Sequence, residues 1–528
     1  MADPGRREAP PPAPPVENPF PEDVWPHGEM KRSVELGAVD HRSVRLWLRL
    51  PDTRHATADL HVEGRPVVHG EATLVPESDW CGAIHLRLDE PAPGAPFTCR
   101  CDGRTFRGRL FPPPGAPSEL RFAFGSCHCP YVECGDRLED SPPVGIYNAM
   151  ADELKAWGCA LLLLGGDQWY ADEFEVTNVR KLLGEDRREV PSYELAVAVY
   201  RHLARGFMGF PSYARLRRSV PCCCMWDDHD IFDNWGSIRP VSAFDQRLFE
   251  AASRVFCEYQ NLRNPCGGVA APPYHYSIEH GDVGILVTDT RGARDWSAGK
   301  LLGDPQWDFL REYVAGASGR RMQTLFIFTS VPVAHVSRWV TRLLDGLGGS
   351  MGNTVRDRWT ASAFIDQRDA LLDLLFEWMR GDEYRQVFLL SGDVHVASAF
   401  DIFDGSGRRA IHQLTSSAIT TTMTWGERQM NRLGVLAPNL FERRWRLRRH
   451  FRCNANNFGR VRVAPLPEGG HRVEFLVRGW QIGAERLDTM AHLVAEPQRE
   501  VEAGLGAPAP PRSHRTESPA HRNARRRS

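Results

Sequence analysis

The chain has 528 residues, of which 42% are apolar and 25% charged, and its 65 basic side chains nearly balance its 67 acidic ones. This composition is typical of a soluble globular protein, and it excludes a wholly disordered chain, a collagen and a nucleic-acid binder that works through bulk charge. The length allows about three domains at ~100–200 residues each. The thirteen cysteines, an odd number with three in a row at 222–224, favour a reducing compartment over a disulfide framework.

The two ends of the chain are predicted to be disordered. Residues 1–30 are rich in proline and lack the apolar core of a secretion leader. Residues 496–528 end in a stretch with six arginines and one acid, for which a solvated tail is favoured over contact with an anionic partner. Between the ends, no apolar run approaches the ~18–20 residues of a membrane helix. These features predict a cytoplasmic protein.

Residues 31–112 are predicted to form a small antiparallel β-sandwich. The segment 43–50 (SVRLWLRL) places an apolar residue at every second position, and 84–88 (IHLRL) repeats this period of two. The stretch 111–120 holds three consecutive prolines, which cannot donate ladder hydrogen bonds, and it is predicted to be a stiff linker.

Beyond residue 120, apolar strands alternate with amphipathic helices. Most of the predicted strands are apolar on both faces, and they are 121–126, 160–165, 221–226, 283–289, 324–330 and 387–392. The predicted helices are 144–157, 192–207, 243–262, 304–315 and 366–380. This alternation predicts an α/β fold with helices on both sides of the sheet. The short strands between 397 and 480 are expected to complete the sheets instead of forming another domain.

Four predicted strands are followed directly by side chains that bind metals. They are Cys127, then Asp167, then Asp227 to Asp230 with His229, and finally Asp393 with His395. Ligands of open α/β sheets bind at the carboxyl ends of the strands, so we expect these groups to meet at one edge. Each group alone is a weak signal, because carboxylates are common at strand ends. The coincidence of four carries the prediction.

Cys127 has four possible roles. Its thiolate binds a soft or ferric metal, or acts as a nucleophile if its pKa is depressed. A structural zinc site with Cys129 and Cys134 and an inert buried thiol are the alternatives. For Cys129, Cys134 and the run 222–224 the inert role is favoured, because free cysteine packs as a small hydrophobe.

Asp167 and Tyr170 share the motif GGDQWY. If the chain turns after Asp167, the tyrosine reaches the same point, and a phenolate suits a ferric ion. The alternative is a buried tyrosine whose hydroxyl is satisfied by the protein. Asp172 and Glu173 are expected to face solvent.

The segment 225–236 is the most unusual, with four carboxylates, a histidine and an amide. Burying so many anions costs roughly several kcal/mol each without cations, which predicts a metal. His229 suits a general acid because its pKa lies near neutrality. Asn234 offers a neutral oxygen to a hard cation such as calcium or magnesium. Asp230 and Asp233 alternatively only cap or turn the chain.

Asp393 and His395 share a face if their segment is extended, and there they would chelate one centre. If the strand ends meet, the Cys127 sulfur must also lie within ~7 Å of the Asp167 carboxylate, because ligand bonds are ~2–2.5 Å long.

Taken in order, these motifs resemble the PhoD-like (alkaline phosphatase D) metallophosphatases of the calcineurin-like metallophosphoesterase superfamily. The shared pattern is Ser-Cys after a strand, GDxxY, WDDH(D/E) with a following Asn, and SGDVH, with supporting matches at 288–294, 329–332 and 356–372. The resemblance spans about 33 to 480. It implies two facing β-sheets flanked by helices over residues 119–495, behind the small sandwich.

The resemblance also implies a ligand set. A ferric ion would be held by Cys127, Asp167 and Tyr170, with Asp167 bridging towards one or two calcium ions or another divalent cation. The remaining ligands would be Asp228, Asn234, Asp393 and His395.

The implied activity is hydrolysis of a phosphoric monoester, with attack by a metal-bound hydroxide. His229 and Asp228 would act in catalysis, His229 by steadying the phosphoryl oxygens or protonating the leaving alkoxide. Arg291 or Arg294 would clamp the phosphate, the alternative being a surface ion pair.

Other functions remain open. A phosphodiesterase would use the same site, and a decayed hydrolase would be a non-catalytic binding protein. A nuclease, and with it a nucleic-acid partner, is not expected, because the charge balance is near neutral. The inserts 174–220 and 335–360 are expected to shape the substrate pocket, while the physiological substrate and the oligomeric state are left open.

Overall fold

The computed structural model describes residues 20, 23–185, 189–237, 241–265, 267, 271–335, 337–345, 355–423 and 437–497. The predicted disorder of 1–19 and of the basic tail from 498 onwards lies outside these residues. The prediction of disorder is wrong for 23–30, where Val24, Trp25 and Met30 are buried. The Trp25 ring packs against Phe207, and its indole N–H donates to His202, so this segment has contacts that proline-rich composition does not reveal.

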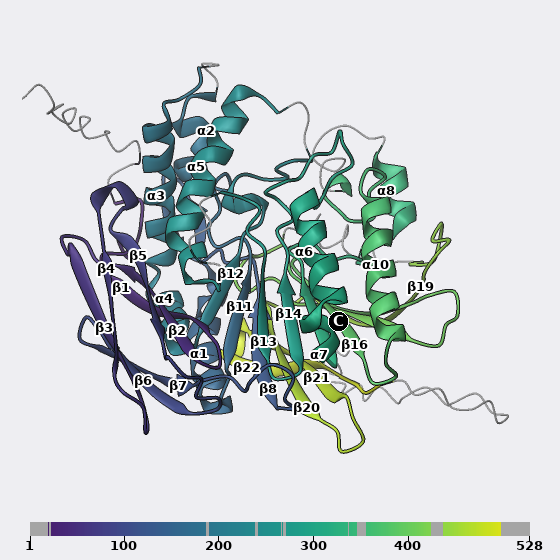
Figure 1. Cartoon of the computed structure of the whole chain (residues 1–528). Coiled ribbons are helices and arrows are strands. Elements are labelled where there is room, and N and C mark those ends of the chain that lie inside the picture. Colours follow the sequence, from purple (N-terminus) through teal and green to yellow (C-terminus); the bar gives the residue numbers. More distant parts are fainter. Residues whose placement is uncertain are drawn as a thin grey trace, which may run out of the picture.

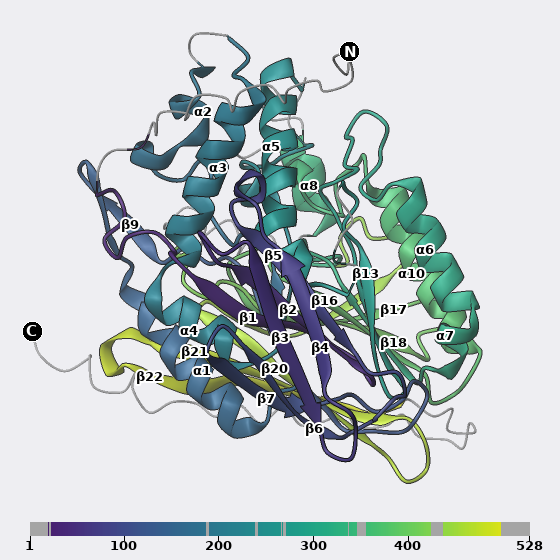
Figure 2. The same ribbon diagram turned by 60° about the vertical axis from the view of Figure 1, so that its left-hand side comes forward.

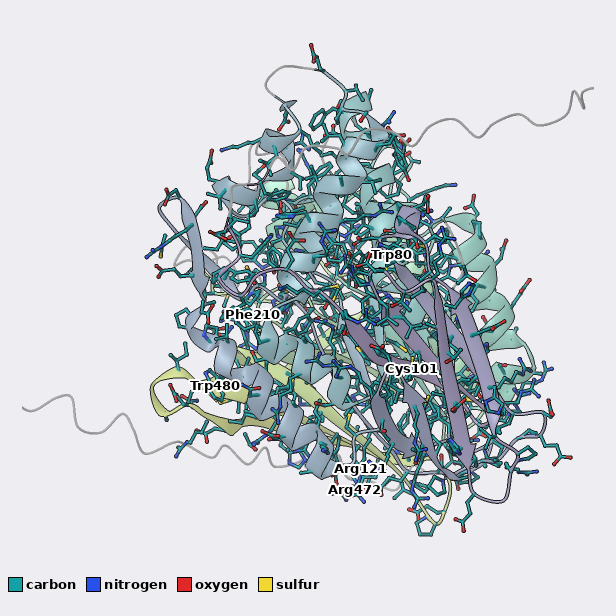
Figure 3. All side chains as sticks on the ribbon, turned by 90° about the vertical axis from the view of Figure 1, so that its left-hand side faces the viewer. Trp80, Cys101, Arg121, Phe210, Arg472 and Trp480 are labelled. Atoms are coloured by element: carbon teal, nitrogen blue, oxygen red, sulfur yellow. The ribbon has the colours of Figure 1, made fainter. Side chains whose placement is uncertain are left out.

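The N-terminal strands form two antiparallel sheets. One holds β1 (Ser33–Val39), β2 (Ser43–Arg49) and β5 (Cys81–Arg87). The other runs in the order β4 (Val68–Thr73), β3 (His55–Val62), β6 (Pro96–Cys101) and β7 (Arg104–Arg109). Figures 1 and 2 show both sheets in purple at one side of the molecule, and Figure 3 looks onto them with Cys101 labelled on β6. Whether residues 31–112 form a separate domain remains a prediction.

All six apolar strands predicted beyond residue 120 are present, and they divide between two larger sheets. The six-stranded sheet has the order β12 (Cys222–Met225), β11 (Leu161–Gly165), β8 (Leu120–Gly125), β20 (Asn457–Pro465), β21 (His471–Gln481) and β22 (Arg486–Ala495). The seven-stranded sheet has the order β13 (Tyr276–His280), β14 (Val283–Val287), β15 (Thr324–Phe328), β16 (Gln386–Ser391), β18 (Ala410–Thr415), β17 (Ala397–Phe403) and β19 (Arg446–Cys453). The late strands complete these sheets, as expected.

The two sheets face each other, as predicted. The rings of Phe122 on β8 and Phe326 on β15 lie 5.1 Å apart, and those of Phe124 and Phe328 lie 5.9 Å apart. The two-sided apolar character of these strands follows from this packing, because one face meets the other sheet and the opposite face meets helices. Within the sheets, β8, β11 and β12 are parallel, and so are β14, β15, β16 and β18. Parallel strands bring their carboxyl ends to one edge.

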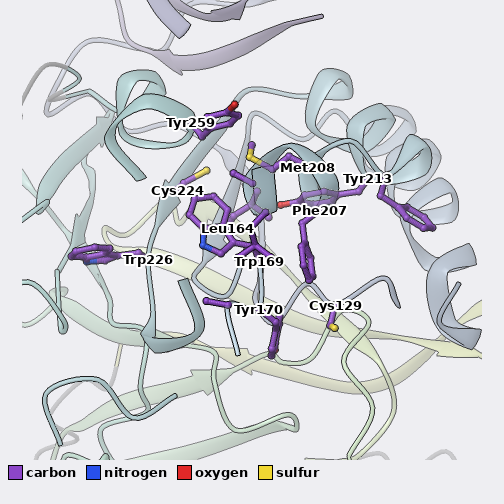
Figure 4. Packing of buried hydrophobic residues seen from close by; sticks show 14 of the residues in the cluster. Cys129, Leu164, Trp169, Tyr170, Phe207, Met208, Tyr213, Cys224, Trp226 and Tyr259 are labelled. Atoms are coloured by element: carbon purple, nitrogen blue, oxygen red, sulfur yellow. The ribbon is translucent and has the colours of Figure 1, made fainter. Parts of the chain in front are cut away.

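Helices cover the outer faces of both sheets (Figure 1). On the six-stranded side lie α1 (Gly145–Trp157), α3 (Tyr193–Met208), α4 (Pro211–Ser219) and α5 (Ala243–Tyr259). On the seven-stranded side lie α6 (Asp304–Ala315) and α10 (Ile365–Arg380). Shorter elements are β9 (Tyr131–Cys134), β10 (Arg137–Asp140), α2 (Val179–Leu182), α7 (Ala317–Arg321) and α8 (Arg338–Asp345). Figure 4 shows Leu164 of β11 packed near Phe207 and Met208 of α3.

The cysteines of the described residues are all free thiols, twelve in number. Cys222 and Cys224 belong to the core under the helices, and Cys223 belongs to the core between the sheets. The run of three cysteines therefore fills a buried strand, as its alternation predicts. Within the part of the chain that the structure describes, no helix has the length and apolar character needed to cross a membrane.

Candidate metal centre

The predicted strand ends meet at one edge of the two sheets. Two glycines permit the approach. Gly166, with φ +96°, has no room for a side chain, because a Cβ there would lie 2.5 Å from the Asp227 Cβ. At Gly392 a Cβ would lie 2.0 Å from the Ser126 hydroxyl. The ends of β11 and β12, and those of β8 and β16, therefore come within contact distance only because these positions lack side chains.

A cluster of three carboxylates occupies this edge, formed by Asp167, Asp227 and Asp228. Each offers an oxygen that lies within 4.8 Å of the corresponding oxygens of the other two, and all three side chains are buried. Among the described residues, Asp167 Oδ1 and Asp227 Oδ2 accept no hydrogen bond. Buried acceptors are rarely left unpaired, so the cluster fits a cation bound by oxygen ligands.

The cluster includes Asp227, which the sequence analysis placed at the end of its strand but left out of the ligand set. Its Oδ1 accepts from the Ser330 hydroxyl at 2.7 Å and from Arg291, which leaves Oδ2 towards the cluster. The available signal was its place as the first acid after β12, but a pair of adjacent acids does not show which member points inwards.

Electrostatics inside the cluster reflect crowding of negative charge. Burial, and then the charge of Asp227, raise the pKa of Asp167 well above its usual range. For Asp227, burial outweighs the opposing charge of Arg291 and raises the pKa to about 6. For Asp228 the positive charges of Arg291 and His229 outweigh burial and hold the pKa below its usual range. Added cations would relieve the repulsion.

Cys127 lies against this cluster, with its sulfur 3.3 Å from Asp167 Oδ2. The prediction that these two groups lie within about 7 Å is confirmed. The Ser417 hydroxyl donates to the sulfur at 2.9 Å, and the Ser126 hydroxyl lies 3.2 Å from it. Burial, followed by the charge of Asp167, raises the pKa of the Cys127 thiol. Cys129 instead directs its thiol to the Tyr131 carbonyl, 3.7 Å away, in line with a packing role.

Tyr170 is buried beside the same residues, because the chain turns after Asp167 as predicted. Its hydroxyl lies 2.8 Å from the Thr421 hydroxyl. Burial, and next the nearby Cys127 and Asp167, raise the pKa of Tyr170. Its ring stacks on His229 with 4.4 Å between ring centroids.

Backbone strain is concentrated at this edge. Five of the seven predicted metal ligands have left-handed φ angles, which are uncommon for residues other than glycine. They are Cys127 (60°), Asp167 (55°), Asn234 (58°), Asp393 (62°) and His395 (54°). Strained residues of this kind persist where the surrounding structure fixes them, and they cluster at functional sites.

The remaining predicted ligands surround the cluster. The backbone N–H of Asn234 donates to Asp228 Oδ2 at 2.7 Å, while its side-chain amide donates to Asp233 at 2.6 Å. The Asp393 N–H donates to the Ser126 hydroxyl at 3.1 Å, and its carboxylate pairs with Arg358. The condition set for a shared face, an extended Asp393–His395 segment, is not met, since both residues are left-handed. The ligand role of His395, which is half-buried, remains a prediction.

His229 is held by Asp172. The Asp172 carboxylate lies 3.1 Å from His229 Nδ1, and its other oxygen accepts from the Asp233 N–H at 2.7 Å. The prediction that Asp172 faces solvent is wrong, because its side chain is only 13% exposed. Burial lowers the pKa of His229, but the Asp172 hydrogen bond and the charge of Asp228 outweigh it and raise the pKa well above the usual value.

Arg291 does not occupy the predicted place as a phosphate clamp. It is fully buried, and its guanidinium contacts Asp227, Asp228 at 3.3 Å and Asp357 at 2.6 and 2.8 Å. Arg294 also pairs with Asp357. A guanidinium whose N–H groups are taken by buried carboxylates neutralises them and has no donor left for a substrate.

Asp230 fixes the backbone of the site. Its carboxylate accepts from the N–H groups of Asp167 at 2.8 Å, Gln168 at 3.0 Å and Asp227 at 2.9 Å. Burial raises the pKa of Asp230 to about 7 against the lowering effect of these bonds. The alternative in which Asp230 only caps and turns the chain therefore describes it correctly.

Asp172 and Asp233 also line a pocket of about 200 Å³ whose other walls include Arg180, Phe232 and Trp235.

Comparisons with known proteins identify the family and the fold. A family model described as PhoD-like phosphatase matches residues 130–469. A solved structure described as that of PhoD is similar with a TM-score of 0.62 at 17% identity, covering 92% of each chain. A purple acid phosphatase from yellow lupin (Lupinus luteus) seeds has a TM-score of 0.54 at 11% identity, covering 90% of this chain and 75% of the other. At these identities the two structures show a shared fold. A search among curated proteins gave no match.

Proposed function

Because the chain belongs to the PhoD-like phosphatase family and is therefore a metal-dependent phosphoesterase, we propose that it hydrolyses phosphoric monoesters where Asp167, Asp227 and Asp228 meet. The observation that carries the proposal is the buried carboxylate cluster whose oxygens lie within 4.8 Å of one another. Such an arrangement costs free energy until cations neutralise it.

The donor set fits two kinds of cation. Cys127 and Tyr170, a thiol and a phenol beside Asp167, suit a ferric ion. Oxygen donors suit calcium or another divalent cation, and these would come from Asp227, Asp228, Asn234 and Asp393, with His395 as a nitrogen donor. When bound, such cations polarise a phosphoryl oxygen and lower the pKa of water.

His229 is proposed as the proton donor to the leaving oxygen. Asp172 occupies Nδ1, and Nε2, which lies 4.0 Å from Asp233 Oδ1, is the nitrogen proposed to meet the substrate. Stacking on Tyr170 fixes the ring plane. Since the carboxylates around it raise its pKa, the imidazole holds a proton to deliver.

Arg291 is proposed to act on the cluster instead of on the phosphate. By pairing with Asp227 and Asp228 it favours the ionised form of both carboxylates and orients them. Asp357 on its other side fixes the guanidinium. The role given to Arg291 in the sequence analysis is replaced by this one.

The test is metal analysis of the purified protein combined with activity on an aryl phosphate monoester and the matching diester, before and after chelation. We expect bound metal, hydrolysis of the monoester above that of the diester, and loss of both activities on chelation. Faster diester hydrolysis would make the protein a phosphodiesterase. Absence of both metal and turnover would favour the non-catalytic binding protein.

A further inference from the structure

A fifth segment reaches the site from the carboxyl end of β18, and no function has been assigned to it. Residues 416–420 are buried. The N–H of Ile419 donates to the Ser126 carbonyl at 2.9 Å, and that of Thr420 to the Cys127 carbonyl at 3.3 Å. The segment, defined here as the hydroxyl loop (residues 416–421), is thus attached to the backbone that carries Cys127.

Two hydroxyls of this loop contact the sulfur and phenol groups of the site. Ser417 donates to the Cys127 sulfur at 2.9 Å. The Thr421 hydroxyl lies 2.8 Å from the Tyr170 hydroxyl and donates to the Cys127 carbonyl at 3.0 Å. The hydroxyl loop therefore contacts both the Cys127 sulfur and the Tyr170 hydroxyl, the two predicted ligands that suit a ferric ion.

The loop itself is held from β20. Asn457 at the start of that strand donates through its side chain to the Ser417 carbonyl at 2.6 Å, and its N–H donates to the Ala418 carbonyl at 2.8 Å. Asn456 donates to the Thr421 carbonyl at 2.9 Å. The two hydroxyls are consequently fixed before any ligand arrives, which is what a positioning role requires.

We propose that Ser417 and Thr421 are positioning residues that fix the Cys127 sulfur and the Tyr170 oxygen towards a shared cation. This inference rests on the proposed function. The Ser417 hydroxyl donates to the sulfur and stabilises negative charge there without bringing a positive charge into the site. Thr421 gives its single proton to the Cys127 carbonyl, so it fixes the Tyr170 oxygen by accepting from it. A lysine or arginine there would instead pair with Asp167 and compete with the cation, because opposite charges attract strongly where water is excluded.

The experiment uses the full chain loaded with ferric iron alone. Sulfur-to-iron and phenolate-to-iron absorption bands report each contact separately from turnover. Ser417→Ala is expected to move the sulfur band to lower energy, because the sulfur loses a donor, and to weaken iron binding by about 10–100-fold. Thr421→Val is expected to move the phenolate band and leave the sulfur band closer to its original position.

Ser253→Ala is the control, since it removes a buried serine hydroxyl of α5 that makes no hydrogen bond among the described residues. It should leave both bands and iron affinity unchanged. Ser417→Thr and Thr421→Ser keep the hydroxyl and should restore the wild-type bands, which separates positioning from a folding defect.

The outcomes separate this inference from the proposed function. If the wild type binds iron and hydrolyses the monoester while Ser417→Ala and Thr421→Val keep wild-type bands and affinity, the positioning role is overturned and the proposed function stands. If the wild type binds no metal and shows no turnover, both fall.

Discussion

Two buried charge clusters of this molecule differ in how their charges are balanced. In the first, Glu35 of β1 pairs with Arg217 of α4 at 3.0 Å and with Arg263 at 2.7 Å, and all three side chains are fully buried. Although burial raises the pKa of Glu35, the two arginines outweigh it and hold that pKa below its usual range. One carboxylate thus has two cations.

In the second cluster the balance is reversed. Asp227, Asp228 and Asp357 share Arg291 and Arg294, and Asp167 adds a fourth carboxylate beside them. Oxygens of Asp167 and Asp227 have no hydrogen-bond partner among the described residues. The comparison teaches that burial of charge alone does not mark a site. A buried excess of carboxylates with unpaired oxygens does mark a site, because such a cluster is costly in free energy unless a cation binds to it.

The largest effect is expected from Asp167→Asn, which removes the central carboxylate of the second cluster. Monoester hydrolysis should fall more than about a thousandfold, equal to over ~4 kcal/mol of barrier, with a parallel loss of bound metal. The measurement is kcat with metal content. Asp282→Asn, which removes a buried carboxylate at the start of β14, is the control and should keep its metal. Retained activity in Asp167→Asn would refute the metal site.

The first cluster gives a smaller and different effect. Glu35→Gln leaves two buried arginines without their carboxylate and should lower the free energy of unfolding by about 3 kcal/mol. Turnover per folded molecule should not change. Urea unfolding measures the loss, and Arg32→Gln, at an exposed pair with Asp102, should cost well under about 1 kcal/mol. A loss of metal in Glu35→Gln would mean that the two clusters are coupled.

Asp172→Asn tests the group that holds His229. It should lower kcat by about tenfold to a hundredfold while metal content is kept. Because the Asp172 hydrogen bond raises the pKa of His229, the alkaline limb of the kcat profile should move to lower pH. Glu173→Gln, on the exposed neighbour, should leave the profile unchanged. An unmoved limb in Asp172→Asn would reduce Asp172 to a structural role.

The smallest effect, taken per pH unit, is a slope in the stability of the metal-free protein. The pKa of Asp167 is raised in the folded state above its unfolded value near 4, so ionisation destabilises the fold as pH rises beyond that value. The free energy of unfolding of Asp167→Asn should therefore exceed that of the wild type by an amount that grows with pH from about pH 4 upwards. This difference should grow by at most ~1.4 kcal/mol per pH unit. Urea melts with chelator measure it. A difference that stays constant with pH would contradict charge repulsion at Asp167. Added metal should abolish the pH dependence of the difference.

Much of the fold followed from local pattern. The strands β8, β11, β12, β14, β15 and β16 lie where the apolar runs predicted them, because strands buried on both faces must be apolar throughout. Residues 23–30 were misjudged, since Trp25 is buried by partners in α3 that are distant in sequence. Composition describes the average of a segment and carries no information about such a partner.

The types of side chain at the site could also be predicted from the sequence, but the contacts between them could not. Motifs at four strand ends determined that a thiol, a phenol, carboxylates and a histidine would meet, because parallel strands place their carboxyl ends together. Only the tertiary structure decided that Asp227 joins the cluster, that Arg291 neutralises it, that Asp172 holds His229, and that Ser417 and Thr421 contact the sulfur and the phenol. Serines, threonines and single acids are common along any chain. Their roles arise from distances between strand ends far apart in sequence, and those distances exist only once the two sheets have packed.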